Sequence, residues 1–254
     1  MKTRILTGVV GIPIVLLCIF GPTPLIYLLG FVMMAALNYE LANMQGEALQ
    51  RSFLIFCFVN MLVAFAVYTF VTKELGFIFA IVNVLVMAET VFTYPRTGLS
   101  EMMYLAFINA YCTWLPLHMI SLRLLDGGAW LLMSVFIMVW VCDSGAYFSG
   151  RALGRHKMAP HLSPKKTIEG SVGGLIASVA FAALIAVVVD RLQGSMPFAL
   201  PCGFGAAGAE KVSFPPMAFA ALGLVAGVFS QAGDLTASLV KRRFGVKDYG
   251  TIFP

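Results

Sequence analysis

The chain has 254 residues, of which 60% are hydrophobic and only 11% are charged, and its formal net charge is +5. An ordinary soluble domain carries about 25% charged residues, so this composition excludes a water-soluble globular protein and predicts an all-α, polytopic membrane protein. The basic residues lie between apolar runs without aromatic–basic interleaving, so we expect membrane lipids as partners and no nucleic acid.

Eight apolar runs are long enough to cross a bilayer core of about 30 Å as helices. They cover residues 5–21, 25–43, 53–71, 75–92, 103–121, 129–148, 172–189 and 214–233. The first run follows basic residues, as in a secretory signal, but no A-x-A site follows it and a second run starts almost at once. We therefore predict about eight transmembrane helices, with an uncleaved first span.

The basic residues sort unevenly between the connecting segments, which indicates the orientation. With the N-terminus in the cytoplasm, four of the 17 Lys and Arg residues lie outside and thirteen inside. We expect a single integral membrane domain over 1–254, with N-terminal spans in 1–125 and a second half, 126–254, that carries the chemistry. In that half the polar residues gather in a predicted cytoplasmic loop, 149–171, and a cytoplasmic segment, 234–254.

Two aspartates follow apolar runs directly, and a carboxylate near hydrocarbon is costly unless it has a partner or a function. Asp143 follows "MVWVC" and Asp234 follows "VFSQAG", so each is expected to end a span. Those spans run in the same direction, which places both side chains at the cytoplasmic face. One or two carboxylates plus substrate phosphates commonly hold Mg²⁺, so we predict Asp143 and Asp234 as metal ligands. The alternative is a boundary residue that faces the lipid headgroups.

The residues after Asp234 form a polar stripe if the helix continues. Ser238 and Lys241 then share a face with Asp234, and Arg242 lies beside them. A carboxylate, a hydroxyl and cations on one stripe suit a metal and the phosphate bound to it. The alternative is a capped helix end followed by a basic stop-transfer cluster.

The stretch "HLSPKKTIEGS", residues 161–171, has the pattern of a helix start. Ser163 is a good N-cap and Pro164 a good first helical residue, which predicts Lys165 and Lys166 in the first turn. Lysine opposes the helix dipole there unless an anion is bound, so we predict a phosphate site, with Glu169 as an ion-pair partner of either lysine. The alternative is a basic cluster that only orients the next span.

Two long stretches resemble the phosphatidate cytidylyltransferases, the CDP-diacylglycerol synthases: "CDSGAYFSGRALGRHKMAPHLSPKKTIEGSVGG" and "SQAGDLTASLVKRRFGVKDYGTIFP". The second begins the family's pattern, Ser-x-x-Lys-Arg followed by Lys-Asp, at Ser238, Lys241, Arg242, Lys247 and Asp248. The resemblance implies an enzyme, with Mg²⁺ as cofactor, that transfers the cytidylyl group of CTP to phosphatidate and releases pyrophosphate. It implies a bacterial inner membrane as the location, with the active site facing the cytoplasm.

On this hypothesis Asp234, Asp143 and Lys241 are catalytic. Substrate-binding roles fall to Ser163, Lys165, Lys166, Ser238, Arg242, Lys247 and Asp248. The family pattern continues beyond the position of Pro254 with a Gly-His-Gly-Gly run and an acidic metal ligand, so we expect a truncated chain. An inactive fragment of the enzyme is therefore one alternative. A transporter for an anionic solute, with a span broken at Pro13 or Pro24, is another. A homodimer is left open.

Overall fold

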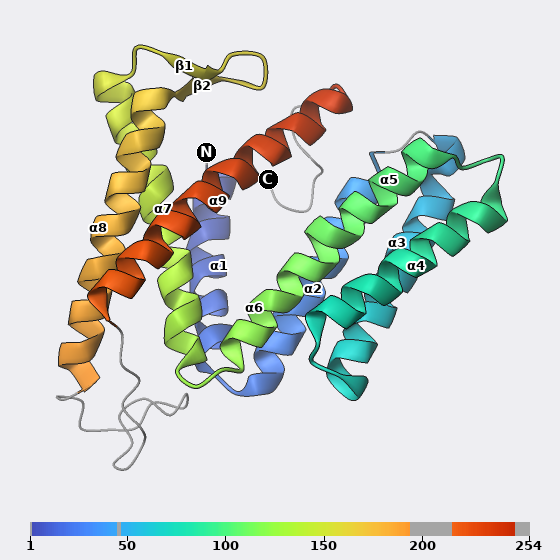
Figure 1. Ribbon diagram of the computed structural model, residues 1–254, viewed down its shortest axis with the longest axis horizontal. Helices are drawn as coiled ribbons and strands as arrows, with labels where there is room; N and C mark the ends of the chain where they lie inside the picture. The colour runs from blue at the N-terminus through green and yellow to red at the C-terminus, as the bar shows by residue number, and fades with distance from the viewer. Residues whose placement is uncertain (1, 45–46, 194–214, 247–254) are drawn as a thin grey trace. The chain divides into compact units, whose positions relative to one another are not determined.

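The computed structural model of the chain describes the backbone of residues 2–44, 47–193 and 215–246 (Figure 1). The described residues divide into two compact units, unit 1 up to residue 125 and unit 2 from residue 126. Within the described residues, unit 1 contains α1 (Lys2–Phe20), α2 (Thr23–Ala42), α3 (Glu47–Ala66), η1 (Val67–Val71), α4 (Leu75–Thr93), α5 (Leu99–Ile108), η2 (Asn109–Trp114) and α6 (Leu115–Arg123). Unit 2 contains α7 (Gly128–Leu153), β1 (Lys157–Ala159), β2 (Ser163–Thr167), α8 (Ile168–Gln193) and α9 (Pro216–Arg243).

The predicted all-α membrane architecture is confirmed. Among the described residues, seven helical segments are long and apolar enough to cross a membrane: Thr23–Ala42, Arg51–Val71, Leu75–Thr93, Leu99–Arg123, Gly128–Leu153, Ile168–Val188 and Pro216–Arg243. Each coincides with a predicted span. The predicted first span coincides with α1, whose described apolar part, Gly11–Phe20, falls short of the length that the other seven reach.

In unit 1 the helix from Leu99 to Arg123 runs without a break through the π-helical segment η2. Pro116 explains the irregularity, because proline has no N–H to donate to the carbonyl four residues earlier. That carbonyl, of Cys112, lies 3.5 Å from the Nδ2 of buried Asn38, which also donates to Thr113 Oγ1 at 3.1 Å. The Asn38 side chain of α2 therefore contacts the Cys112 carbonyl oxygen, which receives no backbone N–H from Pro116.

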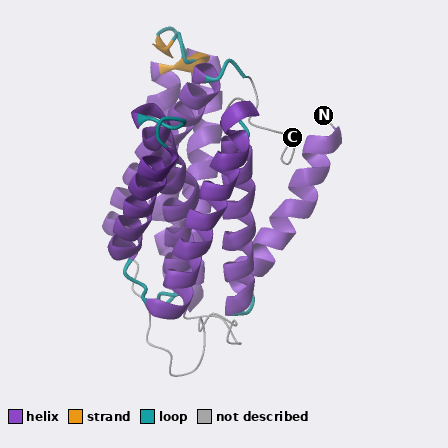
Figure 2. Ribbon diagram, turned by 90° about the vertical axis from the view of Figure 1, so that its right-hand side faces the viewer, coloured by secondary structure: helices purple, strands orange, loops and turns teal. Residues whose placement is uncertain are grey.

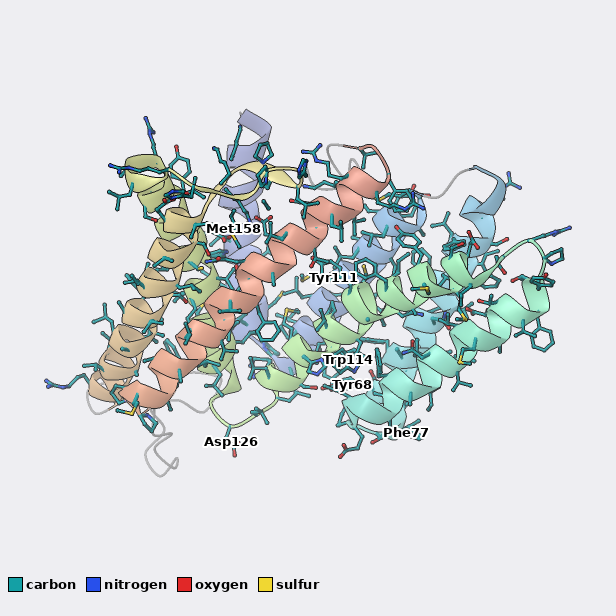
Figure 3. All side chains as sticks on the ribbon, turned by 45° about the horizontal axis from the view of Figure 1, so that its top comes forward. Tyr68, Phe77, Tyr111, Trp114, Asp126 and Met158 are labelled. Atoms are coloured by element: carbon teal, nitrogen blue, oxygen red, sulfur yellow. The ribbon has the colours of Figure 1, made fainter. Side chains whose placement is uncertain are left out.

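The two π-helical segments described in unit 1 are also tied to neighbouring helices. Tyr68 of η1 shares a 2.8 Å hydrogen bond with Ser121, and Trp114 of η2 donates to the Leu75 carbonyl oxygen at 2.9 Å. Figure 3 labels both aromatic residues. These contacts satisfy polar groups inside an apolar bundle, where an unpaired group is costly.

In unit 2, glycines let α7 and α8 approach closely. A Cβ atom added at Gly145 of α7 would lie 2.7 Å from the Ala177 Cβ, and one added at Gly174 of α8 would lie 2.7 Å from the Cys142 carbonyl oxygen. Small residues at helix interfaces have this role in membranes, because neighbouring helices there gain stability from close packing. The α7–α8 seam thus holds the two backbones at a fixed, short separation.

Helix α9 packs on the same pair through another small residue. The Ser178 hydroxyl of α8 donates to the Gly223 carbonyl oxygen at 2.8 Å, and a Cβ at Gly223 would lie 2.6 Å from the Ala182 Cβ. Figure 1 shows α7, α8 and α9 side by side, with the hairpin β1–β2 joining the ends of α7 and α8. Figure 2 shows the same strands at the end of the helices.

The hairpin corrects the prediction for residues 163–166. Strand β2 pairs antiparallel with β1, with Lys157 opposite Thr167 and Ala159 opposite Ser163, so Lys165 and Lys166 lie in a strand and not in the first turn of a helix. Helix α8 begins at Ile168, and Gly170 in its first turn donates its N–H to the Thr167 hydroxyl at 3.2 Å. The N-cap is therefore Thr167, since its side-chain oxygen accepts an N–H of the first turn. Pro164 fits the strand, because proline is tolerated on an edge strand.

One predicted boundary is also wrong, and the continuation of the helix after Asp234, on which the predicted polar stripe depends, is confirmed. Helix α7 runs on to Leu153 and α8 starts at Ile168, so the connection is shorter than 149–171. Residues 234–243 continue α9 as helix. Neither Asp143 nor Asp234 ends its helix, and each lies about 13–15 Å of helix before the end, at 1.5 Å per residue.

Candidate functional site

A cavity of about 370 Å³ lies in unit 2, where α7, α8, α9 and the hairpin meet. Asp143, Tyr147 and Arg151 line it from α7, at a spacing of four residues that places them on one helix face. The Arg151 guanidinium donates to the Tyr147 hydroxyl at 3.4 Å. The α7 wall therefore presents an acid, a phenol and a cation along one line.

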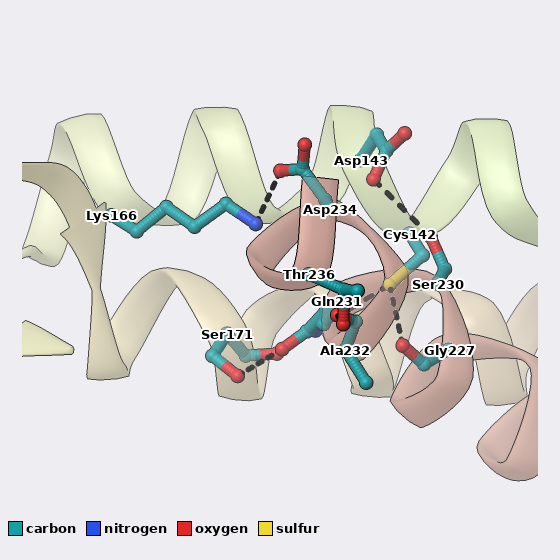
Figure 4. Close-up of polar contacts among 10 residues, drawn as sticks. All are labelled: Cys142, Asp143, Lys166, Ser171, Gly227, Ser230, Gln231, Ala232, Asp234 and Thr236. Carbon is teal, nitrogen blue, oxygen red and sulfur yellow. Dashed lines mark hydrogen bonds and ion pairs between the residues drawn. The ribbon is translucent and has the colours of Figure 1, made fainter. Parts of the chain in front are cut away.

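The hairpin supplies further cations to the same cavity. Lys165 and Lys166 of β2 line it together with Met158 of β1, which Figure 3 labels. Because Lys166 forms an ion pair with Asp234 of α9, the strand and the helix are joined across the cavity (Figure 4). The Lys166 side chain is 27% exposed and the Asp234 side chain 58%, so this pair remains open to solvent.

Asp143 lies close enough to interact electrostatically with both Asp234 and Lys166. One of its oxygens, Oδ1, accepts a 3.5 Å hydrogen bond from the Ser230 hydroxyl of α9. Figure 4 shows the two aspartates on neighbouring helices with Lys166 approaching from the hairpin. The two carboxylates therefore lie close together, as predicted, but each comes from a position before the end of its helix.

Gln231 fixes α9 against α8 and α7. Its Nε2 donates to the Ser171 carbonyl oxygen at 3.0 Å and contacts the Cys142 sulfur at 3.5 Å, and its Oε1 accepts from the Ser171 hydroxyl (Figure 4). Sequence reasoning missed Gln231, Ser171, Ser230 and Arg151. The available signal was the helical period, because Gln231 precedes Asp234 by three residues and shares its face.

Glu169 anchors the base of the hairpin. Among the described residues its ion pair is with His156 and not with Lys165 or Lys166, so the expected Lys–Glu169 pair is wrong. Its carboxylate accepts the backbone N–H groups of Arg155 and His156 at 3.1 to 3.2 Å. The imidazole Nδ1 of His156 lies 2.6 Å from the same carboxylate. One side chain in the first turn of α8 thus holds the segment that leads into β1.

The other predicted site residues lie apart from the cavity lining or outside the description. Ser163 begins β2, and Ser238, Lys241 and Arg242 lie farther along α9. Among the described residues, none of these four lines the cavity. Arg242 donates to the Leu162 carbonyl oxygen at 3.4 Å, which ties the end of α9 to the hairpin turn. Lys247 and Asp248 lie outside the described residues.

The donor set suits a hard cation that shares its coordination with a ligand. Within the described part of the chain, no group of three or more His, Cys, Asp or Glu side chains is placed to hold a metal ion. Asp143 and Asp234 offer carboxylate oxygens on one cavity, and Mg²⁺ is commonly held by one or two carboxylates plus substrate phosphates. The residues present therefore fit Mg²⁺ completed by phosphate oxygens, and a four-ligand zinc site is a poor fit.

Comparison with known proteins decides the family. The model of the cytidylyltransferase family matches residues 2–254. The chain belongs to the cytidylyltransferase family. The resemblance noted in the sequence is thereby confirmed, and the cavity with its acids and cations is the candidate site of a cytidylyltransferase.

Several curated relatives are similar to this cytidylyltransferase chain. A phosphatidate cytidylyltransferase of Bacillus subtilis (strain 168) is 29% identical over 266 residues, which cover 100% of this chain and 89% of the relative. One of Brucella suis biovar 1 is 40% identical over 139 residues, covering 53% of this chain and 43% of the relative. One of Haemophilus influenzae is 38% identical over 127 residues, covering 50% of this chain and 38% of the relative. The matched segments thus span less than half the length of the last two.

Proposed function

We propose that this chain transfers the cytidylyl group of CTP to phosphatidate, giving CDP-diacylglycerol and pyrophosphate. The observation that carries the proposal is one cavity that brings Asp143 and Asp234 together with Arg151, Lys165 and Lys166, in a member of the cytidylyltransferase family. The names of the similar bacterial proteins support phosphatidate as the acceptor.

Both substrates are anions, so their approach is opposed by charge repulsion. Arg151, Lys165 and Lys166 reduce that repulsion by contacting phosphate oxygens, and they stay in place as charge shifts toward the leaving group. A phosphate oxygen of phosphatidate attacks the α-phosphorus of CTP. The bond from that phosphorus to the bridging oxygen breaks in line, and its electrons leave with pyrophosphate.

Asp234 and Asp143 would hold Mg²⁺ in this proposal. When bound, the ion supplies Lewis-acid charge neutralisation at the phosphoryl oxygens. Ser230 orients Asp143 through its hydroxyl, and Gln231 sets the position of α9 and hence of Asp234. The chain's own contribution is to place these oxygens and the cations around one reacting phosphate.

The surface around the cavity suits a lipid substrate. Phe148, Ile168 and Val172 are each at least half exposed and lie on α7 or α8 next to cavity residues. Exposed apolar side chains on membrane-spanning helices face acyl chains. The headgroup of phosphatidate enters the cavity while its tails stay in the bilayer, and CTP enters from the cytoplasm of a bacterium, on the side to which the basic residues assign the hairpin.

The test is incorporation of labelled CTP into lipid by membranes that contain this chain, with added phosphatidate. We expect Mg²⁺-dependent formation of CDP-diacylglycerol, and Asp234→Asn should lower it at least about a hundredfold, because one electrostatic contact to a reacting group contributes on that order. Asp126→Asn, in an exposed turn away from the cavity, is the matched control. Uptake of an anionic solute without lipid labelling would favour the transporter alternative instead.

A further inference from the structure

The ammonium of Lys166 forms an ion pair with Asp234, the carboxylate that would bind the metal in the proposed function. Its Nζ pairs with Oδ2 of Asp234, and the same charge acts on Asp143 (Figure 4). Asp143 and Asp234 repel one another across the cavity. Lys166 therefore offsets part of the negative charge of the two acids.

An ammonium on Oδ2 weakens the binding of a divalent cation to the same carboxylate, because like charges a few ångströms apart repel. Mg²⁺ can bind Oδ2 of Asp234 only after Lys166 has left that oxygen. The ion pair is partly exposed, and exposed pairs are weak, so it opens readily. Lysine suits such a movement, since it carries a compact charge on a flexible four-carbon stem.

We propose that Lys166 is an exchangeable counter-ion: it occupies Asp234 while the cavity lacks metal and nucleotide, and it transfers to a phosphate oxygen when both arrive. This inference rests on the proposed function. Metal and phosphate then bind together, because the metal displaces the lysine from the acid and the phosphate gives the lysine a new partner. Free metal alone is held weakly, since it competes with a tethered ammonium.

Lys165 provides the matched comparison. It is the preceding residue of the same strand, lines the same cavity and is more exposed than Lys166. Both lysines line the cavity, but among the described residues the ion pair with Asp234 belongs to Lys166 and not to Lys165. Removing either charge changes the net charge of the cavity equally, but removing Lys166 alone frees the Asp234 oxygen.

The experiment is a titration of the purified full chain in detergent with Mn²⁺, followed by electron paramagnetic resonance, without nucleotide. We expect Lys166→Gln to bind Mn²⁺ at least about tenfold more tightly than the original chain, and Lys165→Gln to stay within about threefold of it. Lys166→Arg keeps the positive charge and should bind Mn²⁺ as weakly as the original chain. Adding Asp234→Asn to Lys166→Gln should abolish the gain.

Unchanged or weaker Mn²⁺ binding by Lys166→Gln would overturn the exchange, as would an equal gain in Lys165→Gln. Size-exclusion profiles and melting temperatures establish that each variant is folded. Mn²⁺ binding by Lys166→Arg shows the effect of changing the side chain while its charge is kept. The labelled-CTP assay on the original chain is run in parallel. Lipid labelling without the Mn²⁺ gain sinks the exchange alone, whereas the Mn²⁺ gain without lipid labelling supports the exchange and sinks the proposed function.

Discussion

Gln231 of α9 and Ser171 of α8 are bonded to each other twice: the amide Nε2 donates to the serine carbonyl oxygen at 3.0 Å, and the serine hydroxyl donates to the amide oxygen. This paired contact sets the rotation of α9 about its own axis. Asp234 lies three residues beyond Gln231 on the same face, so the contact also fixes where its carboxylate meets the cavity.

Gln231→Ala should therefore lower the rate of lipid labelling about tenfold or more while the protein stays folded, because a small displacement of a catalytic group is expensive in rate. Stability should fall only modestly, since hydrogen bonds between membrane helices contribute about 0.6 kcal/mol on average. Thr236→Ala is the control, because that hydroxyl bonds within α9 to the Ala232 carbonyl oxygen. Equal rates for both variants would remove Gln231 from the site.

Asp143→Asn tests the second carboxylate. Asparagine keeps an oxygen for the Ser230 hydroxyl, so the local structure should persist while the negative charge is lost. We expect turnover to drop about a hundredfold, with a higher Mg²⁺ concentration needed for half-maximal rate. A Mg²⁺ dependence identical to that of the original chain would show that Asp143 does not face the metal.

Glu169→Ala should loosen the hairpin, because this side chain accepts the N–H groups of Arg155 and His156. We expect faster amide hydrogen exchange over residues 155–167, measured by mass spectrometry, and slower turnover. Glu101→Ala is matched to it, since Glu101 accepts the Gly98 N–H at 2.8 Å at the start of α5. That control should change exchange near Gly98 and leave the hairpin unaffected, so a change in the hairpin with both variants would contradict the anchoring.

Gly145→Ala should destabilise unit 2. The added Cβ would lie 2.7 Å from the Ala177 Cβ, so the α7–α8 seam must open, at a cost of about 1–3 kcal/mol. Gly233→Ala is the contrasting change, because nothing lies within 4 Å of a Cβ at that position of α9. Melting temperatures in detergent should fall for the first variant and hold or rise for the second; a fall of equal size in both would argue against the close seam.

Long apolar runs made the helices readable from sequence, because a bilayer imposes a minimum length on each span. That Asp143 and Asp234 lie near one another was predictable, because their two spans run in the same direction. The distance of Asp143 from the end of its helix was not, since polar and small residues after the apolar run extend α7 to Leu153.

The hairpin was missed for a local reason. "SPKK" carries an N-cap and a first-turn proline, but the apolar period of α8 starts only at Ile168, and Thr167 offers the hydroxyl that the helix uses. The partner of Lys166 was beyond any local pattern, since Asp234 comes from a helix that meets the strand only when α7, α8 and α9 are packed. Gln231 was overlooked because an uncharged amide does not disturb a hydropathy profile.

The pairing of β1 with β2 has a consequence for which lysine reaches the acids. With Lys157 opposite Thr167, the neighbouring Lys166 side chain meets Asp234. A slip of one residue would reverse every side chain of β2 and present Lys165 in its place. The register of this five-residue strand thus determines which of two adjacent lysines, Lys165 or Lys166, pairs with Asp234.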